Sequence, residues 1–225
     1  MVSAEESARR IDAILRNNLR QLPKDENEKT LNNLWKFVGD AISNDYSQKQ
    51  ICAEAAKLIN RTLPFAEISL ALRVPGTRTF RYEAVVGFRQ EVEKELRNRT
   101  YTEEEAINSD REPHIRLDNF IDFELAEGTS HVDHTFEQLE YNRPTRLLEE
   151  RKALDEMKEG DYIVVFFRGI RGELLGYVEL ESPRNRKLPQ GNVLKWLEIF
   201  GMIIGILLQS ADVHGQHSAP VAVKS

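Results

Sequence analysis

The sequence predicts an α+β fold in which helices near both ends of the chain enclose antiparallel strands. Apolar residues recur at helical spacing in residues 3–60 and again in residues 192–210. Between these regions they alternate with polar residues at every second position, as in half-buried strands. The strands occur in hairpin pairs and do not alternate singly with helices, so a Rossmann-like parallel sheet is not expected.

Three helices are expected before the first strand. They cover residues 3–22, residues 30–43 and a stretch that follows Ser47. Ser47 is a suitable N-cap residue, and Gln50 occupies the capping-box position three residues later. The apolar face of this third helix places the single Cys52 in the core, where it would act as a small apolar residue.

Two hairpins follow from the alternating segments. "AEISLALR" and "TFRYEAVVG" form the first, and "DYIVVFFRG" and "ELLGYVELES" form the second. One further strand is expected within "HIRLDNFIDFEL". Residues 90–112 are dominated by charge and fit either helix or loop. "RPTRLLEERKALDEMKEG" (143–160) predicts a helix with Pro144 in its first turn and Gly160 just beyond its end, and residues 192–210 form the closing helix.

The charge distribution argues against a nucleic-acid partner. The net charge is −6, and residues 117–142 hold seven acids without a Lys or Arg. The only short basic run, "RNRK" (184–187), is too small to form a nucleic-acid surface. The N-terminus is too polar for a signal peptide, and the longest apolar stretch, residues 196–208, is short for a membrane span and contains Glu198. We therefore expect a cytoplasmic protein with no membrane and no nucleic-acid partner.

The stretch "GELLGYVELESPRNRKLPQGNVLKWLEIFGMIIGILLQ" (172–209) resembles the C-terminal half of GAF domains. In that family a hairpin strand of the form Gly-x-hydrophobic-x-hydrophobic leads to a small or proline-containing turn, a loop and a long helix. Upstream, residues 41–73 look like the family's opening helix-then-strand passage, and the resemblance runs from about residue 31 to 210. The places of the family's final strand and turn are taken here by Gly176, Val178, Leu180, Ser182 and Pro183.

The resemblance implies a GAF-like (PAS-related) six-stranded antiparallel sheet with N- and C-terminal helices packed on one face. Loops on the other face would roof a small-molecule pocket. With this resemblance we expect an N-terminal helical extension (1–28) and a GAF-like domain (29–211), and the tail (212–225) has so few groups to bury that we expect it to be disordered. The implied function is that of a standalone, non-catalytic domain that senses a ligand or relays a signal, as a homodimer through its terminal helices or with a signalling protein.

The dimer contact is expected on the terminal helices of the domain. In "GMIIG" (201–205) the small residues lie four apart, which fits a helix-to-helix contact and close packing onto the sheet equally well. The residues expected at the interface are Leu31, Leu34, Trp35, Gly201 and Gly205.

No enzyme signature of the family is present. Its free methionine-sulfoxide reductases need a resolving thiol as well as a nucleophile, and its bilin-binding members need a cysteine near the pocket, where Cys52 does not lie. The Asn-Lys-x-x-Phe signature of its cyclic-nucleotide binders, the nucleophile elbow and the phosphate loop are also absent. We expect no identifiable cofactor, and the ligand is an unknown small molecule.

"GTSHVDHTF" (128–136) first suggests a metal pair, His131 and His134. Read as a helix, it has Ser130 as N-cap and Asp133 in the first turn, with the two histidines away from the apolar stripe. A pocket lid without a metal is therefore favoured. Two alternatives remain, a small enzyme that uses this His/acid cluster with or without a metal, and a ligand-free assembly module.

Arginines near the acidic stretch have two interpretations. Arg143, Arg146, Arg168 and Arg171 fit surface pairs with these acids, or a grip on an anionic ligand at a pocket mouth. The residues expected to contact a ligand are Arg116, Asp118, His131, His134 and Arg168.

Overall fold

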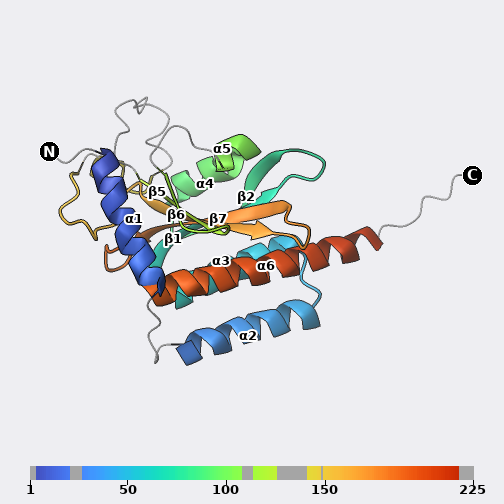
Figure 1. Cartoon of the computed structure of the whole chain (residues 1–225). Helices are drawn as coiled ribbons and strands as arrows, with labels where there is room; N and C mark the ends of the chain where they lie inside the picture. The colour runs from blue at the N-terminus through green and yellow to red at the C-terminus, as the bar shows by residue number, and fades with distance from the viewer. Residues whose placement is uncertain (1–3, 21–26, 108–113, 126–140, 148, 218–225) are drawn as a thin grey trace, which may run out of the picture.

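A curled antiparallel sheet lies at the centre of the molecule (Figure 1). The structure is a computed structural model that describes residues 4–20, 27–107, 114–125, 141–147 and 149–217. In spatial order the strands are β3 (Thr100–Thr102), β2 (Thr79–Val86), β1 (Phe65–Arg73), β7 (Leu174–Pro183), β6 (Tyr162–Arg168), β5 (Ile121–Glu124) and β4 (His114–Arg116). The predicted α+β class is confirmed. There are seven described strands where six were expected, and two of the seven, β3 and β4, are three-residue edge strands.

The helices form two layers on one face of the sheet. Helices α3 (Gln48–Thr62) and α6 (Gly191–His217) pack directly on the strands. Helix α1 (Ala4–Arg20) packs on α6, and α2 (Asn27–Ser43) lies outside α3 and α6, as Figure 1 shows. The opposite face carries α4 (Gln90–Asn98) and α5 (Glu103–Ile107).

The main core lies between the sheet and the helices. The inward residues of β1 and β7 meet apolar residues of α3 and α6 there, and all of them are almost fully buried: Ile68, Leu70, Val178, Leu180, Leu58, Ile59, Leu197 and Phe200. Helix α1 adds Ile11 and Leu15, both fully buried. The described helix of the predicted N-terminal extension, α1, therefore contributes to the same core as the sheet, α3 and α6.

The third helix begins as the sequence predicts. Ser47 and Gln50 form the reciprocal capping box, and Ile51 and Cys52 are buried. Residues 90–107 form α4, β3 and α5, and "HIRLDNFIDFEL" forms two strands, β4 and β5, where one was expected. Helix α6 extends to His217, so the tail predicted from residue 212 begins as helix.

The helix predicted at residues 143–160 is wrong. Among its described residues only a 3-10 turn, η2 (Pro144–Arg146), is helical. Arg151 and Asp161 explain the difference, because they form a buried ion pair with 3.0 Å between Nη1 and Oδ2. Residues ten apart would be separated by about 15 Å along a helix. The helical propensity of this segment is therefore outweighed by tertiary ion pairing.

Helix α6 combines two properties. By length and composition alone, Gly191–Ala211 is long and apolar enough to cross a membrane, but half of that stretch is buried inside the molecule, as in the core helix of a globular domain. Two glycines in its middle face the sheet: a Cβ on Gly201 would lie 2.8 Å from Cγ1 of Val165, and one on Gly205 would lie 2.6 Å from the carbonyl oxygen of Arg168. Both glycines thus serve close packing onto β6.

Candidate functional site

The sheet face opposite α3 and α6 carries two rows of polar residues. The strand register aligns the first row as His114, Glu124, Tyr162, Glu181 and Glu67, across five strands from β4 to β1. The second row is aligned as Arg116, Asp122, Val164, Glu179 and Ser69. The two rows bring five carboxyl groups together on one face.

The register pairs two of these carboxyl groups directly. Glu67 on β1 is opposite Glu181 on β7, and like charges at directly opposite positions destabilise a sheet. Glu67 is only 1% exposed, so water does not screen this repulsion well. Such an arrangement requires a counter-charge, a proton or a ligand.

Arg143 supplies a counter-charge from outside the sheet. Its Nη2 donates to Oε1 of Glu67 at 2.6 Å, and its Nε donates to Oε2 of Glu159 at 2.7 Å. Ser182 completes the network, because its hydroxyl contacts the guanidinium and donates to Oε2 of Glu67 at 3.0 Å. One arginine thus holds two buried carboxylates.

The second row is bordered by tyrosines. Glu179 accepts hydrogen bonds from the hydroxyl of Tyr82 at 2.5 Å and from Ser69 at 2.8 Å. Tyr82 makes edge-on ring contacts with Tyr101 and Tyr177, at centroid distances of 5.5 Å and 6.2 Å. Burial raises the pKa of the Tyr82 phenol well above its usual value, so these hydroxyls stay protonated and act as hydrogen-bond donors.

Burial also changes the carboxyl groups. It raises the pKa of Glu179, although the hydrogen bonds from Tyr82 and Ser69 oppose the shift. Burial and the neighbouring carboxylates, Glu67 first among them, raise the pKa of Glu181 well above its usual value, with Arg143 acting in the opposite direction. This face therefore holds carboxyl groups for which the ionised form is costly. A bound cation or hydrogen-bond donor would lower that cost.

The predicted ligand residues are divided between this face and its edge. Arg116 lies in the second row and forms a bidentate pair with the buried Asp122, both contacts at 3.1 Å. Asp118 instead closes a turn, because its Oδ1 accepts the backbone N–H groups of Phe120 and Ile121. Arg168 lies beside that turn and donates to the carbonyl oxygen of Asn119 at 3.2 Å. His131 and His134 lie outside the described residues.

Two of the other arginines form described ion pairs with acids outside the expected stretch. Arg143 pairs with Glu67 and Glu159, and Arg146 pairs with Glu149. None of these three acids belongs to the acidic stretch at residues 117–142. Arg116, just before the stretch, forms an ion pair with Asp122 inside it. Four of the seven acids of the stretch, Glu127, Asp133, Glu137 and Glu140, lie outside the described residues, so pairing of the arginines with them stays a prediction.

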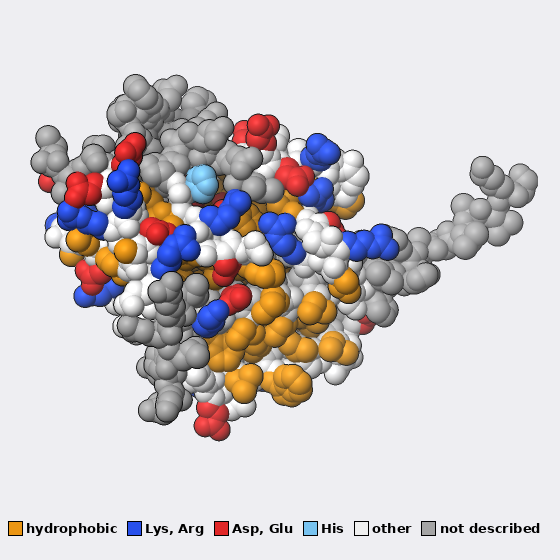
Figure 2. Space-filling view, in the orientation of Figure 1, with side chains coloured by type: hydrophobic (Ala, Val, Ile, Leu, Met, Phe, Trp, Pro, Cys, Tyr) orange, Lys and Arg blue, Asp and Glu red, His pale blue; other side chains and the backbone are white. Residues whose placement is uncertain are grey.

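A second surface lies on the helical side. Five of the seven large exposed apolar side chains of the described residues are on α2 and α6: Leu31, Trp35, Ile42, Met202 and Ile206. Figure 2 shows the apolar area that spans these two helices. On α2 the exposed residues belong to the stripe 31, 35, 38 and 42, whose spacing of four, three and four is that of a coiled-coil seam. We call this surface the α2–α6 seam.

The seam corrects part of the expected dimer contact. Trp35 is 75% exposed and Leu31 is 51% exposed, so both are available to a partner. Leu34 is 2% exposed and belongs to the core. Gly201 and Gly205 face β6, and the large apolar side chains that α6 exposes are Met202 and Ile206.

We call the sheet face that carries the two rows the polar face. The thiol of Cys52 does not reach it. Cys52 is fully buried in α3 on the helical side of the sheet, and burial raises the pKa of its thiol far above the usual value. In the part of the chain that the structure describes, no group of three or more His, Cys, Asp or Glu side chains is arranged to hold a metal ion.

The sequence contained a signal for the polar rows that the prediction did not use. Glu67, Ser69, Glu179 and Glu181 occupy the positions of β1 and β7 that alternate with apolar residues. Such positions normally face water. Alternation identifies the two faces of a strand, but it does not show that α4 and the segment at residue 143 cover the second face.

Comparison with solved structures identifies the fold. No model of a protein family matches the sequence, and no curated protein does. Several solved structures match over most of the chain. The GAF domain of an Acinetobacter phosphoenolpyruvate-protein phosphotransferase has a TM-score of 0.52 at 11% identity, with 86% of this chain and 98% of that chain covered.

Two further structures have similar scores. The GAF domain of a protein assigned as a sensor histidine kinase from Pseudomonas syringae pv. tomato has a TM-score of 0.51 at 11% identity, covering 85% of this chain and 92% of that one. A bacteriophytochrome from the photosynthetic bacterium R. palustris has a TM-score of 0.54 at 10% identity, covering 88% of this chain and 41% of that one. With the strand order and the helical layer described above, these matches show that the chain has a GAF-like fold.

Proposed function

We propose that the chain is a non-catalytic sensory domain that relays a signal by self-association through the α2–α6 seam. The observation that carries the proposal is the seam itself. Trp35 and its neighbours form an apolar stripe with coiled-coil spacing on a helix that the sheet does not cover. The GAF structures that the fold resembles include one from a protein assigned as a sensor histidine kinase.

The polar face is the place where we propose that the signal molecule binds. Strand β7 connects the two surfaces, because Glu179 and Glu181 point to the polar face while Val178 and Leu180 pack in the core beneath α6. A ligand that changes the position of β7 would therefore also move the apolar surface of β7 against which α6 packs. The carboxyl-rich rows favour a ligand with ammonium or other hydrogen-bond donor groups.

Sedimentation analysis tests the self-association. We expect the full chain to be a dimer at micromolar concentration and Trp35→Glu to be a monomer, because a charge in an apolar interface is left unpaired. Leu154→Glu is the matched control, since Leu154 is 41% exposed and lies outside the seam. A monomeric parent protein, or a Trp35→Glu variant that remains dimeric, would refute the relay mechanism.

Calorimetric titration with a panel of primary amines tests the ligand class. We expect at least one amine to bind the full chain, and Glu181→Gln to weaken that binding. Glu91→Gln, on the exposed surface of α4, should leave it unchanged. If the protein dimerises through the seam but binds no member of the panel, the amine-sensing role is refuted and the ligand-free assembly module becomes the better description.

A further inference from the structure

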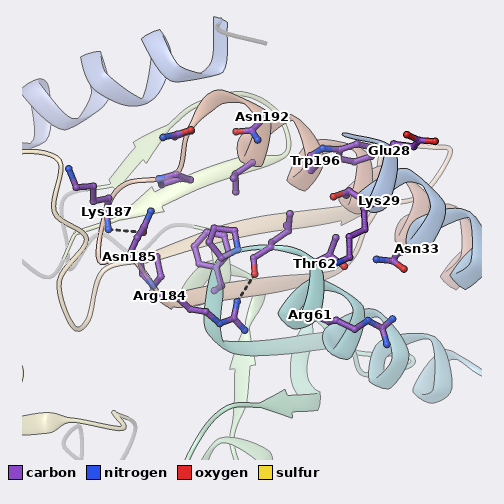
Figure 3. Close-up of a pocket in the computed structure, with 18 residues that line it drawn as sticks. Glu28, Lys29, Asn33, Arg61, Thr62, Arg184, Asn185, Lys187, Asn192 and Trp196 are labelled. Atoms are coloured by element: carbon purple, nitrogen blue, oxygen red, sulfur yellow. Dashed lines mark hydrogen bonds between the residues drawn. The ribbon is translucent and has the colours of Figure 1, made fainter. Parts of the chain in front are cut away.

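A cavity on the helical side of the sheet is not used by the proposed sensory function. Its volume is about 740 Å³, which is within the range of small-molecule sites. It lies where the start of α2, the end of α3 and the start of α6 meet the turn that follows β7. Figure 3 shows the side chains that surround it. The carboxyl-rich rows lie on the opposite face of the sheet, so the two sites are distinct.

The lining of this cavity is positive although the protein is acidic. Four cationic side chains line it, Lys29, Arg61, Arg184 and Lys187, against a single acid, Glu28. They come from α2, from α3 and from the turn after β7. Arg184 and Lys187 belong to the "RNRK" run, which is too short to form a nucleic-acid surface, and in the cavity they lie with two cations from distant parts of the chain, Lys29 and Arg61.

Three of the four cations have no carboxylate partner among the described residues. Lys29 and Arg61 are exposed and make no ion pair there. Arg184 donates only to carbonyl oxygens, those of Leu63 and Asn60, both at 2.8 Å. Lys187 is the exception, because its ammonium contacts Asp155 at 2.7 Å.

The contacts of Arg184 fix its position while donors remain available. Its backbone N–H also bonds the carbonyl of Pro64 at 2.7 Å, so the residue is held at the end of α3. A guanidinium has five N–H donors, and the two carbonyls use only part of them. A held arginine with donors to spare is well suited to bind a phosphate oxygen.

The start of α6 adds favourable electrostatics to the same cavity. Asn192 and Val193 of its first turn line the cavity, and no acidic residue occupies that turn. The first N–H groups of a helix have no intrahelical acceptor, and the helix dipole favours an anion there. Independently of the helix end, the side-chain carbonyl of Asn192 is buried and accepts no hydrogen bond from the described residues. A ligand hydroxyl or a water carried with it would supply that missing donor.

We propose that this cavity binds a small phosphate-bearing molecule. Arg184, Arg61 and Lys29 contact the phosphate, and the first turn of α6 stabilises its charge. The indole of Trp196 forms part of the wall, where it can pack against the organic portion of the ligand. Its Nε1 is held by Asn27 at 3.0 Å, so this wall is fixed before the ligand arrives.

Isothermal titration calorimetry of the full chain tests the proposal with three probes: pyrophosphate, adenosine monophosphate and adenosine. We expect both phosphates to bind and adenosine not to bind. Lys29→Glu and Arg61→Glu should each weaken pyrophosphate binding by about tenfold or more, because each removes a charge-assisted contact. Both positions are exposed, so the fold tolerates the change.

Lys94→Glu is the matched control for net charge. Lys94 is exposed on α4, on the other face of the sheet, and its reversal should change the affinity by less than about twofold, since distant charges are screened. Absence of pyrophosphate binding at millimolar concentration would overturn the proposal. Equal weakening by all three reversals would also overturn it, because binding would then reflect overall charge and not this cavity.

Discussion

Replacement of Arg143 by methionine tests whether the polar face depends on this single cation. Methionine keeps most of the apolar stem and removes the guanidinium that joins Glu67 to Glu159. Removing one partner from a buried ion pair costs about 3–5 kcal/mol. The Arg143 side chain is 38% exposed, so water partly replaces it, and we expect a loss of about 2–3 kcal/mol in the free energy of unfolding.

Urea denaturation monitored by circular dichroism measures this loss. Arg146→Met is the matched control, because Arg146 forms an exposed pair with Glu149, at 3.3 Å, and such pairs contribute about 0–1 kcal/mol. The loss at Arg143 should also be smaller near pH 5 than near pH 8. Burial already raises the pKa of Glu159, and removal of the guanidinium raises it further, so protonation relieves the unpaired charge as the pH falls.

Two results would refute this reasoning. The first is a difference of less than about 0.5 kcal/mol between the two variants, which is the scatter of ordinary surface substitutions. The second is a loss at Arg143 that does not depend on pH. Either result would mean that the carboxylates of Glu67 and Glu159 are satisfied without the guanidinium.

Three further predictions concern other parts of the fold. Gly205→Ala should lower the free energy of unfolding by about 1–2 kcal/mol, since its Cβ would meet the carbonyl of Arg168 at 2.6 Å. Gly39→Ala, where nothing lies within 4 Å of the new Cβ, should raise the free energy of unfolding by about 0.5–1 kcal/mol. Urea denaturation measures both changes. Cys52 should react with a thiol reagent only at the rate of unfolding, because burial raises its pKa and blocks access; rapid labelling of the native protein would contradict this. Protonation of Glu181, whose pKa is raised well above 4.5, contributes stability that is complete below about pH 4.5 and is lost as the pH rises through the raised pKa. The free energy of unfolding of Glu181→Gln should therefore rise relative to that of the parent as the pH increases from about 5 to about 8. A difference between variant and parent that is the same at both pH values would contradict the raised pKa of Glu181.

Local sequence patterns were sufficient for the elements whose determinants are neighbours in the chain. The capping box of Ser47 and Gln50 needs only a three-residue separation, and the two hairpins need only alternation and turn residues. The closing helix and the buried Cys52 followed from helical periodicity in the same way. These features also carried the resemblance that predicted the GAF-like fold.

The segment at residues 143–160 shows where local patterns fail. Its composition favours a helix, yet Arg143 pairs with Glu159 and Arg151 pairs with Asp161, and a helix would hold the members of each pair apart. The interaction energy comes from partners distant in the sequence, as with Glu67, 76 residues away. No local window of the sequence contains the pairing with Glu67.

Helix α2 and the polar rows show the same limit. Periodicity placed Leu31, Leu34 and Trp35 on one stripe, but only Leu34 is buried. Helix α2 lies in the outer layer and packs on α3 and α6 with one side only, so the rest of the stripe stays exposed. The alternating Glu67 and Glu181 looked solvent-facing, and only the tertiary structure shows them opposite each other on a covered face. A sequence fixes which side chains share a face of a helix or strand, since that follows from backbone geometry. Which face becomes covered depends on the packing of elements distant in the chain, and that packing decided the seam, the polar rows and the basic cavity.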